Sequence, residues 1–366
     1  MRIGIITLPL HVNYGGIMQA FALQYVLRKL GHTSEVIDRG LVPQYSFYVY
    51  FYKILRAFAA RLIKGCKRPI FIKHYIKKNA PIQERYTSSF VDKYINRRLC
   101  RNLYQIKSNE YDAFIVGSDQ IWRPMYYRPI MNAYLDFAED WNVKRVAYAV
   151  SFGTDKWEYS RKEEFLCRKL VKKFDLVTVR ESQAVDICRE HYGINAKHVL
   201  DPTMLLTKEE YINIFKLDSL PDCGGEMMIY LLDFNLKNEA MISVLIHLLN
   251  LKAFRTNTFQ YSNDVQIQPP VENWLKSFMD SKFVVTDSFH ACVFSIIFNK
   301  DFVVFGNEKR GLLRFHSLLS MFDLEDRLVN EKNINTIALK PIDWEKINEK
   351  LVLLRGNSMD VLNEML

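Results

Sequence analysis

A histidine at the start of a helix is the residue of this sequence best suited to move a proton. Residues 283–286 (FVVT) predict a buried strand, and Asp287 and Ser288 are natural caps for the apolar helix that follows. His290 then falls in the first turn of that helix, where an imidazole can exchange a proton near neutral pH. A first-turn histidine without a chemical role is the alternative, so His290 alone does not define a site.

Polar residues also follow an earlier strand. Ser118 and Asp119 come directly after the apolar run 113–116, and Trp122 lies three residues further on. Asp119 could orient or deprotonate a hydroxyl group, and the indole of Trp122 could stack on a sugar. A helix cap beside a core tryptophan is an equally good interpretation of the same residues.

An arginine ends the next buried strand. Arg180 follows the run 176–179 (LVTV), and its planar, permanently charged guanidinium suits a carboxylate or a phosphate. Glu181 could simply neutralise this charge. The loop 201–203 (DPT) follows a further strand, and we interpret it as structural.

The first strand leads into a loop with glycines. Asn13, Gly15, Gly16 and Gln19 stand where this loop enters the first helix. Glycines let the backbone approach a ligand, and the free N–H groups of a helix N-terminus favour an anion or a sugar oxygen. A glycine turn that merely permits tight packing is the alternative. The spacing is neither GxGxxG nor GxxxxGK, so it matches neither a dinucleotide-binding loop nor a Walker loop.

The elements that position these residues alternate between strands and helices in both halves of the chain. Parallel strands joined by helices require a right-handed crossover and two covered sheet faces. We therefore predict an α/β fold with two Rossmann-like domains, residues 1–190 and 191–366, facing a common cleft. The chemistry should lie at the carboxyl ends of the strands. The helical pattern of residues 343–364 should pack back on one of the domains.

Residues 41–105 interrupt this alternation with aromatic and basic residues, and we predict a helical insertion without strands. A helix within residues 45–68 would place its four basic residues within an arc of about 140° and leave the opposite arc apolar. These four are Lys53, Arg56, Arg61 and Lys64. Such a helix suits peripheral contact with an anionic membrane. A packed helix with a solvated basic face is the alternative.

Composition limits the class of protein. A hydrophobic content of 49% with only 14 Gly and 11 Pro excludes a disordered or collagen-like chain, and the net charge of +9 favours anionic partners. The six cysteines stand singly and show no zinc spacing, which predicts a reduced, cytoplasmic protein without a metal site. We expect no membrane span, because no uncharged run approaches roughly 18 residues. Dispersed basic residues and the lack of a recognition motif argue against nucleic-acid binding.

Taken together and in order, the motifs resemble the polysaccharide pyruvyl transferase family. They are NYGGxxQ near the start, IVGSDQIW, TVRES, DPT and finally TDSFH. The resemblance spans roughly residues 3–325, and the GSDQ-x-W element and the late histidine are its more specific parts. It implies a fold similar to the glycosyltransferase B architecture. It also implies transfer of a pyruvyl group, as a ketal, from phosphoenolpyruvate to a sugar of a polysaccharide or a lipid-linked precursor, without a further cofactor.

The resemblance also implies roles for the residues above. His290 would be the general acid, with Asp119 as base or acceptor orienter. Many relatives carry arginine two positions before the histidine, where this chain has Ser288, and Arg123 is one substitute. The expected phosphoenolpyruvate-binding residues are Arg180, Ser288, His290, Lys309 and Arg310. The expected acceptor-binding residues are Asn13, Gly15, Gly16, Gln19, Ser118, Asp119 and Trp122.

Two other functions remain open at this point. A glycosyltransferase with the same architecture would use a nucleotide-sugar donor, although the glycine region around Gly306 is a poor match to a nucleotide loop. A non-catalytic anion-binding protein of the same fold is the other alternative, because an expected arginine is missing.

Overall fold

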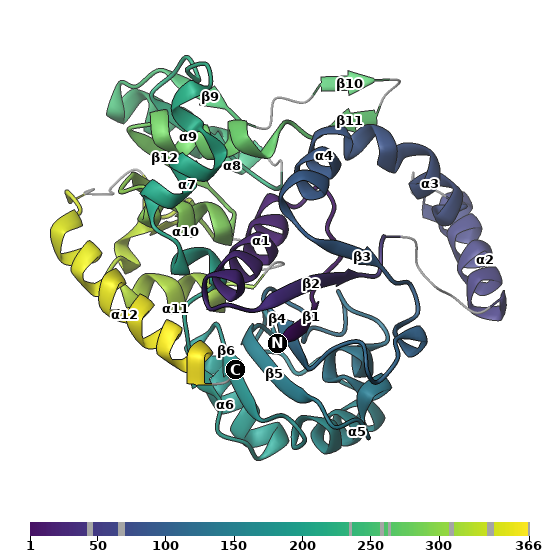
Figure 1. The fold of residues 1–366 in the computed structure, drawn as a ribbon. Helices are drawn as coiled ribbons and strands as arrows, with labels where there is room; N and C mark the ends of the chain where they lie inside the picture. Colours follow the sequence, from purple (N-terminus) through teal and green to yellow (C-terminus); the bar gives the residue numbers. More distant parts are fainter. Residues whose placement is uncertain are drawn as a thin grey trace.

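The structure is a computed structural model of the chain. It describes residues 1–41, 47–64, 70–233, 236–256, 260–262, 265–306, 311–334 and 340–364. Two α/β units stack on each other, as Figure 1 shows, and each is built on a parallel sheet with helices around it.

The first domain has a seven-stranded, entirely parallel sheet in the order β3-β2-β1-β4-β5-β6-β7. Its strands are β1 (Arg2–Ile6), β2 (Thr33–Asp38), β3 (Arg97–Leu99), β4 (Ala113–Gly117), β5 (Lys144–Val150), β6 (Leu176–Val179) and β7 (Lys197–His198). The central strands β4 and β5 are buried over nearly their whole length and largely apolar, because helices and turns cover both faces of the sheet. The strand order reverses between β1 and β4, and such a switch point is where open α/β sheets bind ligands.

The helices of this domain are α1 (Tyr14–Lys29), α2 (Phe47–Lys64), α3 (Ile72–Gln83), α4 (Arg85–Tyr94), α5 (Arg161–Val171) and α6 (Ser182–Ile187). Local capping explains where α5 starts, because Ser160 and Glu163 form a reciprocal capping box. The insertion is helical as predicted, but β3 lies within it. The short run 97–99 pairs with β2 as an edge strand, which a three-residue polar segment does not reveal in the sequence.

The second domain has a smaller parallel sheet in the order β14-β13-β12-β8-β9. Its strands are β8 (Met227–Tyr230), β9 (Ala253–Arg255), β12 (Phe283–Thr286), β13 (Asp301–Phe305) and β14 (Leu328–Val329), with the hairpin β10 (Gln260–Ser262) and β11 (Val265–Ile267) beside it. Its helices are α7 (Lys208–Phe215), α8 (Leu236–Leu249), α9 (Val271–Asp280), α10 (Phe289–Ile297), α11 (Leu313–Met321) and α12 (Trp344–Glu364). The order again reverses, here between β8 and β12.

Two predicted assignments change. β7 pairs with β6 in the first sheet, whereas the alternation placed it at the start of the second half. The polar, Pro-terminated segment 251–270, whose composition suggests a loop around one edge strand, holds β9 and the hairpin. The last helix does pack back, on the loop after β7. Ser358 accepts a hydrogen bond from the backbone N–H of Leu200 at 3.1 Å, and Arg355 donates to the carbonyl of Met204 at 2.8 Å.

Helix α1 joins the two domains. Tyr14 at its start donates a hydrogen bond to the carbonyl of Pro269 at 2.6 Å, and its ring lies against Tyr230 and Trp274 of the second domain. A helix that faces a sheet on one side and a second domain on the other is buried nearly all round, and 13 of its 16 residues are buried. The first turn of α1 therefore lies at the junction of the domains.

Candidate functional site

The buried carboxylate of Asp201 is the point where the site residues meet. Asp201 follows β7 and starts a short 3-10 turn, Pro202–Leu205. One of its oxygens, Oδ1, accepts hydrogen bonds from the N–H and the hydroxyl of Thr203, at 3.0 and 2.7 Å. These bonds fix the carboxylate and leave Oδ2 for other partners.

Three side chains from three other strands converge on Oδ2. The Ser118 hydroxyl after β4 donates to it at 3.0 Å, and Nη1 of Arg180 after β6 donates at 2.9 Å. Nε2 of His290, after β12 in the second domain, lies 3.6 Å away. Burial by itself raises the pKa of Asp201, but His290 and Arg180 outweigh it and hold that pKa well below its usual range. Asp201 is thus an ionised acceptor shared by both domains.

Two guanidinium groups lie over one aromatic ring. Arg180 stands 4.3 Å from the ring centroid of Phe289, and Arg314 of α11 stands 5.5 Å from the same centroid. Asp119 Oδ1 and Glu181 Oε1 lie 3.5 and 3.9 Å from Nη2 of Arg180. Burial and the charge of Arg180 lower the pKa of Arg314 to about 10. Both arginines stay charged at neutral pH, and such a pair attracts an anion.

The first loop contributes a second histidine. Burial lowers the pKa of His11 to about 4, against a smaller opposing effect of the charge on Asp119. His11 is therefore neutral at physiological pH. Burial likewise raises the pKa of Glu181, whose Oε1 accepts a hydrogen bond from the Ser151 hydroxyl. The site thus contains groups of both signs with altered proton affinities, a feature typical of functional clefts.

Several buried polar atoms in this region have no hydrogen-bond partner among the described residues. They are Nδ1 of His11, Nε of Arg180, Oε2 of Glu181 and Nε2 of His290. An unsatisfied buried polar group costs about 1–3 kcal/mol, and a bound ligand could supply the missing partners here. Donors and acceptors are both present, which fits a ligand with polar atoms of both kinds.

Backbone geometry orients Asp119 and brings α1 against His290. Gly117 has a φ of +135°, and a side chain there would run into the carbonyl of Tyr148. Asp119 itself adopts φ +60°, and its carbonyl accepts the N–H of Ser151 at 3.1 Å. A Cβ on Gly15 would lie 2.0 Å from Nδ1 of His290, so only glycine allows the first turn of α1 to reach the imidazole.

Some predicted residues have a different place. Trp122 is completely buried, with its indole stacked on Tyr134 and bonded to the carbonyl of Ala133, so no face is left for a sugar. Gln19 is also internal, because its amide donates to Thr7 and its oxygen accepts the N–H of Ser118. Both residues support the site from inside rather than line it.

The other predicted residues divide into three groups. Ser288 caps α10 by accepting the N–H of Ala291 at 3.4 Å, and Asn13 is exposed at the start of α1. Arg123 is buried and pairs with Glu158, so it offers no free charge to a donor. Lys309 and Arg310 lie outside the described residues.

Sequence reasoning missed three members of the site. Asp201 was interpreted as structural, although its position after a strand is the signal that selected the other loops. His11 lies in the loop between the first strand and the first helix, but it is not part of the Asn-Gly-Gly pattern that indicates a ligand there. Arg314 sits inside a helix, away from any strand end, and only the packing of α11 against α6 brings it near Arg180.

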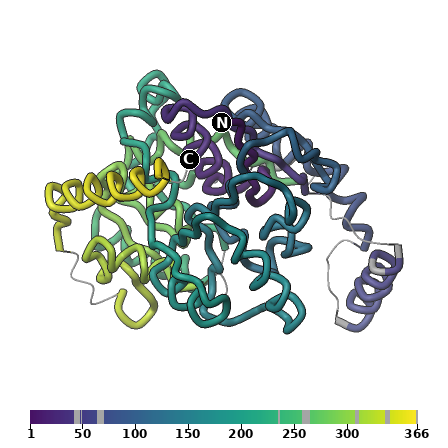
Figure 2. The backbone as a smooth tube through the Cα atoms, turned by 60° about the horizontal axis from the view of Figure 1, so that its bottom comes forward, coloured from purple at the N-terminus to yellow at the C-terminus, as the bar shows by residue number. Residues whose placement is uncertain are grey.

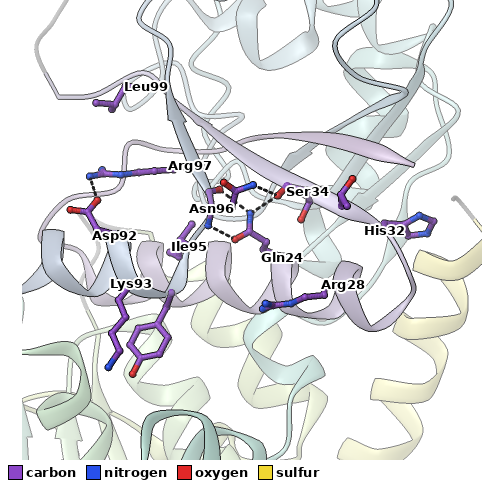
Figure 3. A pocket seen from close by; sticks show the side chains of 12 residues that line it. Gln24, Arg28, His32, Ser34, Asp92, Lys93, Ile95, Asn96, Arg97 and Leu99 are labelled. Carbon is purple, nitrogen blue, oxygen red and sulfur yellow. Dashed lines mark hydrogen bonds and ion pairs between the residues drawn. The ribbon is translucent and has the colours of Figure 1, made fainter.

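A groove of about 810 Å³ lies elsewhere, beside the first residues of β2. Figure 3 shows hydrogen bonds among Gln24, Asn96 and Ser34 and an ion pair between Arg97 and Asp92. Gln24 donates to the carbonyls of Ser34 and Asn96, and Arg97 pairs with Asp92 at 2.7 Å. The groove lies at the amino ends of the strands, whereas open α/β sheets bind ligands at the carboxyl ends, so the site around Asp201 remains the stronger candidate.

Among the described residues no three His, Cys, Asp or Glu side chains are grouped to hold a metal ion, and no helix is long and apolar enough to cross a membrane.

Replacing Gly15 by alanine should destabilise the protein. The added methyl group would overlap the imidazole of His290 and force α1 and α10 apart, which we expect to lower the free energy of unfolding by about 1–3 kcal/mol. Gly16→Ala is the matched control, because its Cβ would only touch the amide of Asn13 at 3.2 Å. Denaturant unfolding of both variants measures the difference. Equal stability of the two would contradict the contact.

His11 should make the protein sensitive to acid. Its pKa is lowered from 6.5 to about 4 by folding, so the unfolded chain binds more protons between these values and stability falls as the pH drops below about 6.5. Over this range His11→Gln should lose about 1–2 kcal/mol less stability than the natural protein. Unfolding free energies at pH 7.5 and 4.5 test this. Parallel losses in both proteins would show that His11 is solvated.

Comparison with known proteins bears on the fold and on the family of this chain. The likeness to solved structures spans the chain. UDP-GlcNAc 2-epimerase from Neisseria meningitidis, solved with UDP-GlcNAc, is 12% identical over 100% of this chain and 99% of its own, with a TM-score of 0.52. A ugt transferase from Siraitia grosvenorii, solved with UDP, is 9% identical over 98% and 95%, with a TM-score of 0.46. No curated protein sequence matches.

At such low identity the epimerase shares the fold alone, which is the predicted pair of Rossmann-like domains in a glycosyltransferase B arrangement. The sequence itself is more specific. A family model described as polysaccharide pyruvyl transferase matches residues 13–309, a range that includes Asp119, Arg180, Asp201 and His290. The chain therefore belongs to the polysaccharide pyruvyl transferase family.

Proposed function

We propose that this protein transfers the pyruvyl group of phosphoenolpyruvate, as a ketal, to a sugar of a polysaccharide or a lipid-linked precursor. The family supports a saccharide acceptor. The observation that supports phosphoenolpyruvate as the donor is the pair of guanidinium groups over Phe289, beside the imidazole of His290. A small donor with both a phosphate and a carboxylate needs two cations close together.

Arg314 supplies the second cation in this proposal. Relatives are expected to carry it at position 288, where this chain has a serine that caps α10. Ser288 retains the anion-binding helix N-terminus, and Arg314 adds the charge from the neighbouring helix. Burial raises the pKa of Glu181, so this carboxyl group beside Arg180 takes up a proton more readily than an exposed glutamate does.

The reaction requires a proton at C3 of the enol. In the proposed mechanism His290, as imidazolium, delivers this proton from Nε2, and C2 becomes electrophilic. A sugar hydroxyl then attacks C2 and loses its proton to Asp119, and the C2–O bond to phosphate breaks. A second hydroxyl attacks C2, closes the ketal and gives its proton to the imidazole of His290, which restores the imidazolium. The products are the cyclic ketal and inorganic phosphate.

Asp201 acts here as a positioning residue. Its ionised Oδ2 lies 3.6 Å from Nε2 of His290 and holds Arg180 in place by an ion pair. The acceptor would approach from the start of α1, where Asn13 is exposed and the backbone at Gly15 and Gly16 lies beside His290.

Phosphate release from phosphoenolpyruvate, measured with a panel of galactosides and followed by mass spectrometry of the sugar, tests the proposal. It predicts release that depends on the acceptor, with one pyruvyl ketal gained. Calorimetry with phosphoenolpyruvate and with UDP-sugars separates the alternatives. Tight binding of a UDP-sugar alone would indicate a glycosyltransferase, and anion binding without turnover would indicate a non-catalytic protein.

His290→Gln should remove the general acid while keeping a polar side chain of similar size. We expect kcat to fall by about 10²- to 10⁴-fold, with little change in the KM for phosphoenolpyruvate. His316→Gln, an exposed histidine on α11, is the control. Substantial turnover by a folded His290→Gln protein would exclude the proposed role.

Arg314→Met keeps an apolar side chain against Phe289 but removes the charge. The loss of one charge-assisted contact should raise the KM for phosphoenolpyruvate by about 10- to 100-fold. Arg314→Lys should recover part of the affinity, because it restores the charge without the planar fork. An unchanged KM in the Met variant, measured by steady-state phosphate release, would place Arg314 outside the donor site.

A further inference from the structure

The insertion carries a helix whose apolar face is turned to solvent. Within α2, seven large apolar side chains are between 52 and 83% exposed: Tyr48, Phe51, Tyr52, Leu55, Phe58, Leu62 and Ile63. At 100° per residue they fill one continuous arc of about 140°. An ordinary amphipathic helix turns such an arc toward the core. In Figure 2, α2 instead stands apart at the edge of the molecule.

The opposite side of α2 faces the protein. Tyr50, Ile54, Ala57 and Ala60 are half-buried there, and Nζ of Lys73 on α3 lies 4.7 Å from the ring centroid of Tyr50. α3 in turn packs on β11, and the carbonyl of Gln83 accepts the N–H of Gln268 at 3.0 Å. The attachment through α3 therefore presents the apolar arc outward.

Charge indicates what this face binds. Residues 39–83 contain ten Lys and Arg and no Asp or Glu, so this segment accounts for the whole net positive charge of the chain. Arg56 lies about 20° beyond one edge of the apolar arc and Arg61 about 60° beyond the other, with Lys53 between them on the basic side, and all three are exposed. Aromatic and aliphatic side chains flanked by basic ones match the boundary between acyl chains and anionic headgroups.

We infer that α2 is a membrane-docking helix that lies in the interface of an anionic bilayer. A second copy of the chain is a poor occupant, because a symmetric contact between two such segments would bring like charges together without any acidic partner. A bilayer satisfies the apolar arc and the basic flanks at once.

The place of α2 in the chain suggests why the contact is useful. The insertion follows the carboxyl end of β2, and the site residues follow the carboxyl ends of β4, β6 and β7 in the same parallel sheet, so both lie at its carboxyl edge. A docked α2 would hold that edge beside the bilayer, where a sugar carried on a lipid would be presented. This last point rests on the proposed function, whereas the docking itself does not.

Vesicle flotation of the full chain tests the docking. The protein should float with vesicles of phosphatidylcholine and phosphatidylglycerol, and bind vesicles of phosphatidylcholine alone at least about tenfold more weakly. The triple variant Lys53→Glu, Arg56→Glu, Arg61→Glu should lose at least about tenfold in binding to the anionic vesicles. The matched control reverses three exposed charges on α5 and its C-cap, Arg161→Glu, Lys162→Glu and Lys172→Glu, and should bind like the natural protein.

The apolar arc has its own pair of variants. Phe51→Ser with Phe58→Ser should abolish flotation, whereas Phe165→Ser removes a phenylalanine that is 71% exposed on α5 and should not. Circular dichroism and phosphate release with a water-soluble acceptor check that each variant is folded and active. Because flotation needs no turnover, it reports on docking even if the proposed reaction is wrong.

Three results would overturn the inference: no flotation of the natural protein with anionic vesicles, equal loss in the α5 and α2 charge variants, or self-association through α2 in analytical ultracentrifugation that the Phe51 and Phe58 changes abolish.

Discussion

The structure depends on one buried carboxylate that both domains share. Asp201 lies after the last strand of the first sheet, yet its Oδ2 faces Arg180 from that sheet and His290 from the second domain. An ion buried without partners would be costly, and here the Arg180 guanidinium, the His290 imidazole and the Ser118 hydroxyl compensate it. The same contacts that make the carboxylate tolerable also bring a guanidinium and an imidazole to one point. The contacts that compensate the buried charge of Asp201 are therefore the same contacts that place Arg180 and His290 in the site.

The glycine at the start of α1 follows from that constraint. Because His290 must reach Asp201 past the first turn of α1, a side chain at position 15 has no room. Tyr14, one residue earlier, fixes the same turn to the second domain through Pro269, Tyr230 and Trp274. Charged groups beyond Asp201 then accumulate around Phe289. Arg314 remains protonated at neutral pH, and burial raises the pKa of Glu181. Both effects make the surroundings of Phe289 more favourable for an anion.

The sequence predicted the fold well, because continuous apolar runs and helical periodicity are local signals in both sheets. It failed where pairing is not local, as in β3, whose three residues become a strand only beside β2, and in β7, which extends the first sheet. Strand ends led to Asp119, Arg180 and His290, which the structure brings together around Asp201. The sequence could not identify Arg314, because nothing near an arginine within a helix shows that it will lie beside Phe289. It suggested a sugar-binding role for Trp122, because the stacking of Tyr134 on the indole depends on residues that the tertiary fold brings together. The basic helix predicted in the insertion has the expected pattern, but only its attachment through α3 shows which face is outside.

The central claim is that a doubly anionic three-carbon donor binds between Arg180, Arg314 and His290. A crystal structure with phosphoenolpyruvate bound tests it most directly. The account predicts that the phosphate and the carboxylate each contact one of the two guanidinium groups, with the methylene carbon facing Nε2 of His290. Phosphoenolpyruvate bound elsewhere would contradict the account. So would phosphoenolpyruvate that contacts neither arginine while Arg180 and His290 contact only Asp201.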